Sequence, residues 1–154
     1  MLTIQEESIK SSGVLSLLHA AVDELNRRYG QSDGPHLSND ELGPPRGVFL
    51  VARLDGHLAG GVGLRAIAEP ESRLGEVKRL WVCPDLRRAG VAAQLMDALE
   101  HHARQLGYRQ LYLETGHAQP EALALYPAIG WNPVDSFPPG VFSHERATRF
   151  TKVL

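Results

Sequence analysis

The sequence predicts an α/β fold in which a mixed, mostly antiparallel central sheet carries helices on both faces. Two β-rich segments that read as a hairpin precede a strand–helix–strand succession. Hairpins pair antiparallel and the strand–helix–strand unit adds a parallel pair, so together they give a mixed sheet covered by helices. The chain has 154 residues, 43% of them hydrophobic and 22% charged, which is the size and composition of one globular domain. We therefore expect residues 1–154 to form a single domain.

The first half of the chain is expected to supply the hairpin. Ser11 and Ser12 can cap a helix whose apolar residues recur at helical spacing, and Gly30 supplies its left-handed end. Asp55-Gly56 is a strong signal for a tight turn between two strands. In chain order, we expect a strand at 2–5, a helix at 11–29, a loop at 31–46 with one helical turn at 39–42, and strands at 48–53 and 57–67.

The second half is expected to supply the strand–helix–strand unit. Pro84 ends the first strand of this half, Gly107 ends its long helix, and Pro120 suits the first turn of a shorter helix. In chain order, we expect a strand at 76–82, a helix at 90–105, a strand at 110–114, a helix at 120–129, a turn at 130–133 and a last strand at 148–153.

The composition excludes several classes of protein. No run approaches the ~18 uninterrupted apolar residues of a membrane span. Residues 1–10 lack the basic start and the apolar block of a secretory signal. Cys83 is the only cysteine, which leaves no disulfide framework and no thiolate cage for a metal. We therefore expect a cytoplasmic protein without a metal.

The charges are unevenly distributed along the chain. The 16 basic and 18 acidic residues give a formal net charge of −2, which argues against a general nucleic-acid binder. Residues 73–109 nevertheless carry a net charge of +3, and the rest of the chain carries −5. This basic middle suggests a local anionic ligand, and a solvated helix face explains it about as well.

The stretch at 76–92, EVKRLWVCPDLRRAGVA, has the pattern of an anion-binding turn. A strand ends at Pro84, and a helix begins near Gly90, where free backbone N–H groups and the helix dipole favour a phosphate. Gly90 and Ala92 have little or no side chain, so a ligand can approach the backbone closely. Arg87 and Arg88 are expected to add positive charge at the rim.

This stretch and its surroundings resemble the GNAT superfamily of acyl-CoA-dependent N-acetyltransferases. The central motif of that family, Gln/Arg-x-x-Gly-x-Gly/Ala, is matched by RRAGVA at Arg87–Ala92, and the strand EVKRLWV before a proline is similar to its fourth strand. Downstream, ALALY at Ala122–Tyr126 followed by Gly130-Trp131 is similar to the family's ALxLY…GF segment. The resemblance covers residues 48–133 well, and the two ends by the order of their elements.

The resemblance implies acetyl-CoA as cosubstrate and assigns residues to it. The strand at 80–82 would pair with the pantetheine arm, which enters a V-shaped gap between this strand and the strand at 110–114. Backbone N–H groups from Arg88 to Ala92 would hold the pyrophosphate, and Tyr126 lies where the family often has a tyrosine near the thioester sulfur. The expected cofactor-binding residues are Leu80, Trp81, Val82, Arg87, Arg88, Ala89, Gly90, Val91 and Ala92.

Acetyl transfer needs a base, because an amine attacks a thioester only when neutral and a lysine-like amine has a pKa of ~10.4. In several members of the family, a glutamate at the position of Glu76 is this base. Strand alternation places it on the same side as Lys78, Leu80 and Val82. An exposed strand glutamate paired with Lys78 or Arg79 is an equally good interpretation.

Tyr126 is the expected general acid, since a phenol can protonate the departing thiolate. A core tyrosine on an apolar helix is the alternative, and Pro127 directly after it should bend the helix. Glu114, which ends the neighbouring strand, is the second candidate for the base. Cys83 has no histidine close in the motif to activate it, so we expect it to fill space rather than to attack.

These residues predict an N-acetyltransferase that moves an acetyl group from acetyl-CoA to a primary amine of a small molecule or peptide. The amine would attack directly in a ternary complex, and the enzyme would be a monomer or homodimer without nucleic-acid or membrane partners. A non-catalytic acyl-CoA-binding sensor of the same fold is the alternative. A phosphate- or nucleotide-binding protein unrelated to CoA is weakened by the missing Walker lysine motif.

The family also implies that the acceptor amine binds against the first helix and the loop after it. Residues 21–47 contain two more acidic than basic residues. This excess favours a cationic amine without a strong anionic group beside its nitrogen. Acids that merely solubilise a loop surface explain this excess at least as well. The acids concerned are Asp23, Glu24, Asp33, Asp40 and Glu41.

Overall fold

The computed structural model describes residues 1–30 and 39–154. Seven strands form one sheet in the order β1-β2-β3-β4-β5-β7-β6. Every neighbouring pair is antiparallel except β4 and β5, which run parallel. The predicted mixed, mostly antiparallel sheet is therefore confirmed. The strands are β1 (Leu2–Glu6), β2 (Val48–Leu54), β3 (His57–Ile67), β4 (Leu74–Val82), β5 (Gln110–Thr115), β6 (Asn132–Val134) and β7 (Thr148–Val153).

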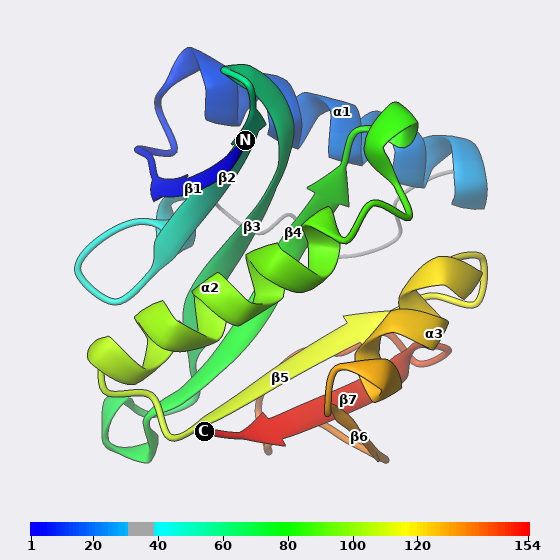
Figure 1. The fold of residues 1–154 in the computed structure, drawn as a ribbon. Coiled ribbons are helices and arrows are strands. Elements are labelled where there is room, and N and C mark those ends of the chain that lie inside the picture. The colour runs from blue at the N-terminus through cyan, green and yellow to red at the C-terminus, as the bar shows by residue number, and fades with distance from the viewer. Residues whose placement is uncertain (31–38) are drawn as a thin grey trace.

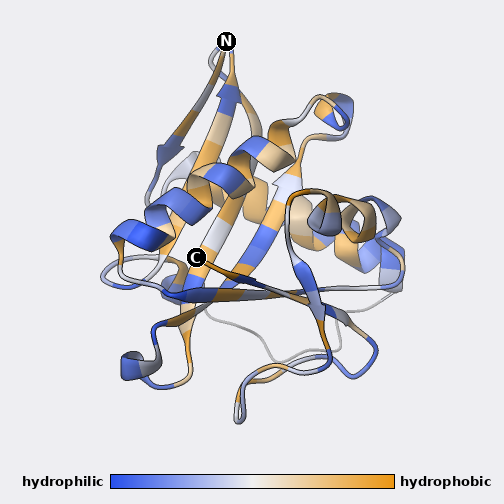
Figure 2. Ribbon diagram, turned by 60° about the horizontal axis from the view of Figure 1, so that its bottom comes forward, coloured by the Kyte–Doolittle hydropathy of each residue, from blue (hydrophilic) through white to orange (hydrophobic). Residues whose placement is uncertain are grey.

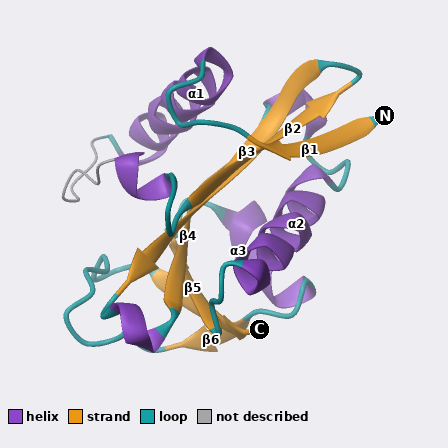
Figure 3. Ribbon diagram, turned by 90° about the vertical axis from the view of Figure 1, so that its left-hand side faces the viewer, coloured by secondary structure: helices purple, strands orange, loops and turns teal. Residues whose placement is uncertain are grey.

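Helices cover both faces of this sheet (Figures 1 and 3). The helix α1 (Ser12–Tyr29) lies against one face, and α2 (Val91–Gln105) and α3 (Pro120–Ala128) lie against the other. Ser11 caps α1 as predicted, because its hydroxyl accepts a hydrogen bond from the N–H of Val14 at 3.2 Å. The shorter 3-10 turns are η1 (Asn39–Leu42), η2 (Pro70–Ser72) and η3 (Pro84–Leu86). Among the residues described, no helix combines the length and the apolar character that crossing a membrane requires.

The core lies on both sides of the central strands. Val48, Leu50 and Ala52 of β2 belong to the large apolar cluster under α2 and α3, whereas Phe49 and Val51 belong to a smaller one under α1. Figure 2 shows hydrophobic residues along the central strands and alternating hydrophilic stretches along α2. A strand that is covered on both faces is apolar at successive positions, which explains the uninterrupted hydrophobic start of β2.

A bulge in β4 separates this strand from its parallel neighbour. Arg79 has a φ of 61°, a left-handed conformation that non-glycine residues seldom adopt, and the register between β3 and β4 shifts there by one residue. On its other side, β4 pairs with β5 only from Leu74 to Glu76. Beyond Glu76 the two strands diverge, as Figure 1 shows, so the second half of β4 has no ladder partner in β5.

The segment predicted as a turn after α3 is in part a strand, so this prediction is wrong for its second half. Asn132, Pro133 and Val134 form β6 and pair antiparallel with β7. The edge of β7 would otherwise be open, and an edge strand tolerates a proline because the missing N–H can face away from the ladder. The first part of the predicted loop at 31–46, residues 31–38, lies outside the described residues. The other predicted elements are present, and β4 begins two residues earlier than expected, at Leu74.

Candidate active site

The divergence of β4 and β5 leaves an open backbone edge on β4. Leu80, Trp81 and Val82 lie beyond the last pair between the two strands, Glu76 and Tyr112. Their other edge is occupied by β3, since Trp81 pairs with Gly61 and Val82 with Gly60. Backbone groups on an unpaired strand edge can bind an extended ligand in the way that an added strand binds. The gap implied by the resemblance is therefore present in the fold.

The turn between β4 and α2 presents free backbone N–H groups. Gly90 precedes the helix with a φ of 82°, and no side chain in the described part of the chain caps it. The first hydrogen bond of the helix runs from the N–H of Gln94 to the carbonyl of Gly90 at 3.1 Å, so the N–H groups of the residues between them have no acceptor within the helix. A Cβ built on Gly90 meets no atom within 4 Å, so the space over the turn is open to a ligand. This is the geometry of an anion site.

The two arginines of this turn have different surroundings. Arg87 does not offer free positive charge at the rim of the turn, contrary to the prediction. Its guanidinium binds Glu24 of α1 at 2.6 Å and the carbonyl of Val82 at 2.9 Å. It also lies over the ring of Trp81, at 5.9 Å from the centroid. Arg88 is exposed and makes no ion pair with any residue in the described part of the chain. Arg87 therefore fixes the turn, and Arg88 alone offers free charge there.

Helix α1 is connected to both walls of the gap by its last turns. Glu24 binds Arg87 on the β4 side, and Arg28 binds Glu24 at 3.3 Å. Arg28 also binds Glu121 of α3 at 2.6 Å and the carbonyl of Ala118 at 2.7 Å. The hydrogen bond to Glu121 raises the pKa of Arg28, so this guanidinium stays charged. One end of α1 thus bridges the anion-binding turn and the start of α3.

Tyr126 projects from α3 into the apolar cluster on the side of α2. Its ring centroid lies 6.2 Å from that of Trp131 and 5.6 Å from that of Phe150. Burial raises the pKa of the phenol far above its ordinary value, so Tyr126 keeps its proton at any physiological pH. Pro127 lies near the C-terminal end of α3, which continues for one more residue, to Ala128.

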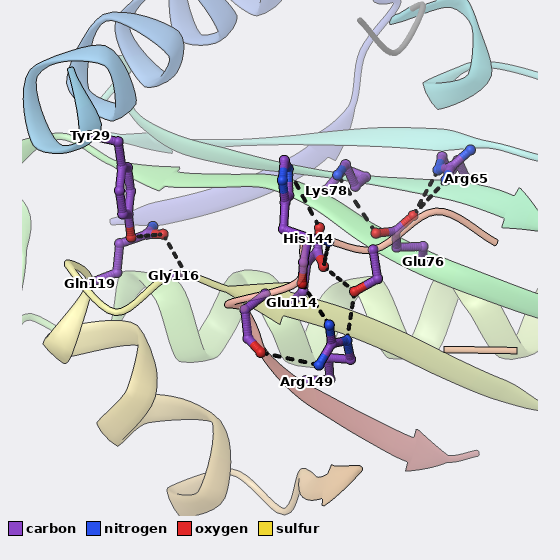
Figure 4. Close-up of polar contacts among 11 residues, drawn as sticks. Tyr29, Arg65, Glu76, Lys78, Glu114, Gly116, Gln119, His144 and Arg149 are labelled. Atoms are coloured by element: carbon purple, nitrogen blue, oxygen red, sulfur yellow. Dashed lines mark hydrogen bonds and ion pairs between the residues drawn. The ribbon is translucent and has the colours of Figure 1, made fainter. Parts of the chain in front are cut away.

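Glu76 is not the exposed strand glutamate that one interpretation of the sequence suggested. It is 1% exposed, and its Oε1 accepts a hydrogen bond from Nε of Arg65 on β3 at 2.9 Å and forms an ion pair with Nη2 of the same residue at 2.8 Å. Lys78 lies 3.6 Å from its other oxygen. Arg79, the second partner proposed from sequence, makes no ion pair with it, and burial lowers the pKa of that guanidinium. Both oxygens of Glu76 therefore face cations (Figure 4).

The expectation that Glu76 shares a face with Leu80 and Val82 is wrong. Leu80 and Val82 pack in the cluster under α2, whereas Trp81 packs against the cluster under α1. Lys78 does lie beside Glu76, as predicted. The left-handed residue Arg79 adds one residue to β4, so strict alternation fails beyond it.

Glu114 lies on β5, two residues beyond its last pair with β4. Its side chain is 8% exposed, and its Oε2 accepts hydrogen bonds from the hydroxyl of Ser143 and from the N–H of His144 at 3.0 Å. Leu113 packs on the side of α2, so alternation directs Glu114 toward the face that α1 covers. Glu76 and Glu114 thus lie on neighbouring strands near the start of the gap (Figure 4).

The loop between β5 and α3 follows the end of β5 that has separated from β4. The Oε1 of Gln119 accepts hydrogen bonds from the N–H of Gly116 at 3.1 Å and from the hydroxyl of Tyr29 at 3.3 Å (Figure 4). A Cβ at Gly116 would overlap the Tyr29 hydroxyl, so a larger residue here would displace that ring. Just before Gly116, the buried hydroxyl of Thr115 has no hydrogen-bond partner among the residues that the structure describes. An orphaned hydroxyl at this position fits a site that a polar ligand completes.

The acid excess expected to attract a cationic acceptor is largely neutralised. Glu24 binds Arg87, and Glu41 binds Arg65 at 3.1 Å, and both partners lie outside residues 21–47. Asp33 lies outside the described residues. The charge of this stretch therefore says little about the acceptor amine.

Cys83 does not have the surroundings of a nucleophile. Its thiol donates a hydrogen bond to the carbonyl of Leu58 at 3.3 Å. Burial raises the pKa of the thiol, which keeps it in its unreactive, protonated form.

Several residues of this site carried no recognisable signal in the sequence. Arg65 meets Glu76 through the register of the β3–β4 hairpin, and His144 meets Glu114 across thirty positions of the chain. Tyr29 and Gln119 join through the packing of α1 on the loop before α3. Only the paired strands and the packed helix bring these side chains together, so spacing along the chain could not reveal them.

Known proteins have the same fold and related sequences. The model of the acetyltransferase (GNAT) family matches residues 15–131. The chain is 37% identical to an IAA acetyltransferase of Azospirillum brasilense, over 84% of this chain and 83% of that protein. It spans 38–60% of the length of the other curated relatives that it matches, all of them N-acetyltransferases by name.

Solved structures agree with these relatives. A protein of Klebsiella pneumoniae described as an acyl-CoA N-acyltransferase has a TM-score of 0.80 at 28% identity, over 100% of this chain and 98% of that one. A GNAT acetyltransferase of Elizabethkingia anophelis, solved with acetyl-CoA bound, has a TM-score of 0.69 at 18% identity, over 99% and 98% of the two chains. The second likeness concerns the fold alone.

The bridge through Glu24 predicts how the anion-binding turn is held. Glu24→Gln removes the charge that binds Arg87, so we expect it to lower the free energy of unfolding by about 1 kcal/mol. We also expect amide hydrogen exchange to become faster at residues 84–90. Glu121→Gln is the matched control, because it breaks only the contact with Arg28. Equal exchange at 84–90 in wild type and Glu24→Gln would contradict this role.

Proposed function

The chain belongs to the acetyltransferase (GNAT) family, and from this membership we propose that it moves an acetyl group from acetyl-CoA to a primary amine of a small molecule or peptide. The amine attacks directly within a ternary complex. The observation that carries the proposal is the gap between β4 and β5 beside the anion-binding turn. An extended arm and its pyrophosphate need these two features at one end of a sheet.

The residues of the gap fit this cosubstrate. Leu80, Trp81 and Val82 offer backbone groups to the pantetheine arm, and the N–H groups from Arg88 to Ala92 hold the pyrophosphate. The open space over Gly90 and the orphaned hydroxyl of Thr115 support this placement. When bound, acetyl-CoA supplies an activated thioester. Arg87 acts through the turn that it fixes.

Side chains of the protein then accept the proton of the amine and donate one to the leaving group. The acceptor arrives as an ammonium ion and must lose a proton before it attacks. Two carboxylates at the start of the gap are candidates for the base, Glu76 and Glu114. Tyr126 protonates the departing sulfur, because a neutral phenol can donate its proton to a thiolate.

Residues 1–154 act as one acetyltransferase domain in this proposal, and the domain works as a monomer or homodimer. We place the reaction in the cytoplasm, on the ground that the sequence carries one cysteine and no disulfide framework.

The alternative is a protein of the same fold that binds acyl-CoA without turnover. The ion pairs of Glu76 favour this alternative, because a carboxylate held by two cations has no free oxygen to offer an amine. Thiol release separates the two functions. We expect free CoA to appear when acetyl-CoA is mixed with the protein and a panel of amines that covers polyamines, amino acids and peptides. Binding of acetyl-CoA without thiol release from any amine would establish the sensor instead.

Gly90→Val tests the cofactor site. Wild type should melt at a higher temperature with acetyl-CoA, which contributes about 2.7 kcal/mol at a hundredfold excess over Kd. Gly90→Val should lose this shift, because the branched side chain fills the open space over the turn. Gly107→Val is the matched control, since Gly107 at the far end of α2 has a φ of 92° and equally open surroundings. If Gly90→Val keeps the wild-type shift, the phosphate site lies elsewhere.

Tyr126→Phe tests the acid. We expect kcat to fall about 100-fold or more, in the range of general acid–base effects. The thermal shift with acetyl-CoA should stay near the wild-type value, because only a proton donor is removed. Tyr108→Phe is the control, since Tyr108 is also a buried tyrosine but donates its hydrogen bond to the carbonyl of Arg46. Wild-type kcat in Tyr126→Phe would remove this residue from the mechanism.

A further inference from the structure

The loop that joins β6 to β7 is fastened to the end of β5. Oε2 of Glu114 accepts hydrogen bonds from the hydroxyl of Ser143 and from the N–H of His144. Arg149 of β7 holds the same two residues from the other side, with Nε donating to the Ser143 hydroxyl at 2.6 Å and Nη2 to the carbonyl of His144 at 2.6 Å. Ser143 and His144 are therefore held between a carboxylate and a guanidinium (Figure 4).

This arrangement directs the imidazole of His144 at Glu114. Its Nε2 lies 3.9 Å from Oε1, the carboxylate oxygen that the loop does not use. The rings of Phe142 and His144 form a T-shaped pair, with centroids 5.0 Å apart. Within the described chain, Nδ1 has no hydrogen-bond partner, and the side chain is 48% exposed. One ring nitrogen thus faces an anion while the other is open to an incoming molecule.

The position of this pair suits a proton acceptor for the amine. Glu114 lies just beyond the point where β5 leaves β4, on the face that α1 covers. Figure 4 draws the imidazole pointing to the same side of the sheet as Lys78. The phosphate turn and Tyr126 lie on the side of α2, so cosubstrate and amine can approach the gap from opposite faces.

Glu76 compares poorly with His144 for this task. Glu76 is 1% exposed and both of its oxygens face cations, whereas the imidazole is half exposed and has a free nitrogen. An imidazole also gains and loses its proton between pH 5 and 8, which a base needs if it is to turn over near neutral pH.

We propose that His144, oriented by Glu114, is the general base of the acetyl transfer, and that the ion-paired Glu76 is structural. This inference rests on the proposed function. One proton of the acceptor ammonium passes to Nδ1 of His144 and from there to solvent. The freed lone pair forms the bond to the acetyl carbon, the carbon–sulfur bond breaks, and the sulfur takes the proton of Tyr126. The second amine proton restores the phenol, so one proton is released for each amide formed.

The charged groups that face His144 are Glu114 from β5 and Arg149 from β7, and Lys78 of β4 lies on the same side of the gap. We therefore compare the pH profiles of variants at His144, Glu114 and Glu76.

The test measures kcat/KM by thiol release, from pH 5 to 9, with an amine that wild type accepts. In wild type we expect kcat/KM to rise between pH 5 and 8. His144→Gln should lower kcat/KM 100-fold or more near neutral pH and should lack this rise. Its thermal shift with acetyl-CoA should equal that of wild type. Added imidazole should restore part of the rate of His144→Ala. His57→Gln, a change at the exposed β2–β3 turn, is the matched control and should keep the wild-type profile.

Two further variants distinguish the role of Glu114 from that of Glu76. Glu114→Gln should lower kcat/KM at least tenfold with little change in KM for acetyl-CoA, as expected of a positioning residue. Glu76→Gln should lower the melting temperature but keep the pH profile. A wild-type profile in His144→Gln, or loss of the pH-dependent rise in Glu76→Gln alone, would overturn the inference while the proposed function stands. Absence of thiol release from wild type with every amine would overturn both.

Discussion

The separation of β4 from β5 is the constraint on which the rest of the site depends. Three residue pairs hold the two strands together, and the bulge at Arg79 then directs β4 away. A parallel sheet would ordinarily pair every backbone group of both strands. Here the second half of β4 keeps one edge open, at the place where the chain turns into the exposed N-terminus of α2. An open strand edge and an open helix start are thereby brought next to one another by one local distortion.

Ion pairs then fix the elements around this opening. Glu24 and Arg28 join α1 to the turn before α2 and to the start of α3. Arg65 holds Glu76 across the β3–β4 hairpin. Each of these pairs is partly or fully shielded from water, so its geometry is better defined than that of a surface pair. The packing of apolar side chains supplies the stability of the sheet, and the charges determine where its loops and helix ends lie.

Much of the fold could be predicted because its signals are local. The cap at Ser11, the turn at Asp55-Gly56 and the proline at the end of β4 each specify a boundary through the chemistry of one or two residues. The basic, glycine-containing turn before α2 could be recognised for the same reason. The bulge could not be predicted, because arginine seldom adopts a left-handed conformation and its side chain carries no signal for one. The error about Leu80 and Val82 follows from this one residue.

Most polar partners of the site were beyond prediction for a different reason, and Lys78, two positions from Glu76 on the same strand, is the exception. Whether Glu76 meets Arg65 depends on the register of a hairpin, and whether His144 meets Glu114 depends on how β7 docks on β5. Asn132–Val134 likewise becomes a strand only because β7 offers it an edge. Such contacts are properties of the assembled sheet.

The surroundings of Cys83 have a consequence for an enzyme that works with thioesters. This residue directly follows the stretch of β4 that we assign to the pantetheine arm. A thiolate there could exchange with the thioester and take the acyl group onto the chain itself. Burial and the hydrogen bond to Leu58 keep the thiol protonated. The fold therefore protects the chain from acylating its own cysteine, and the donor is kept for the amine.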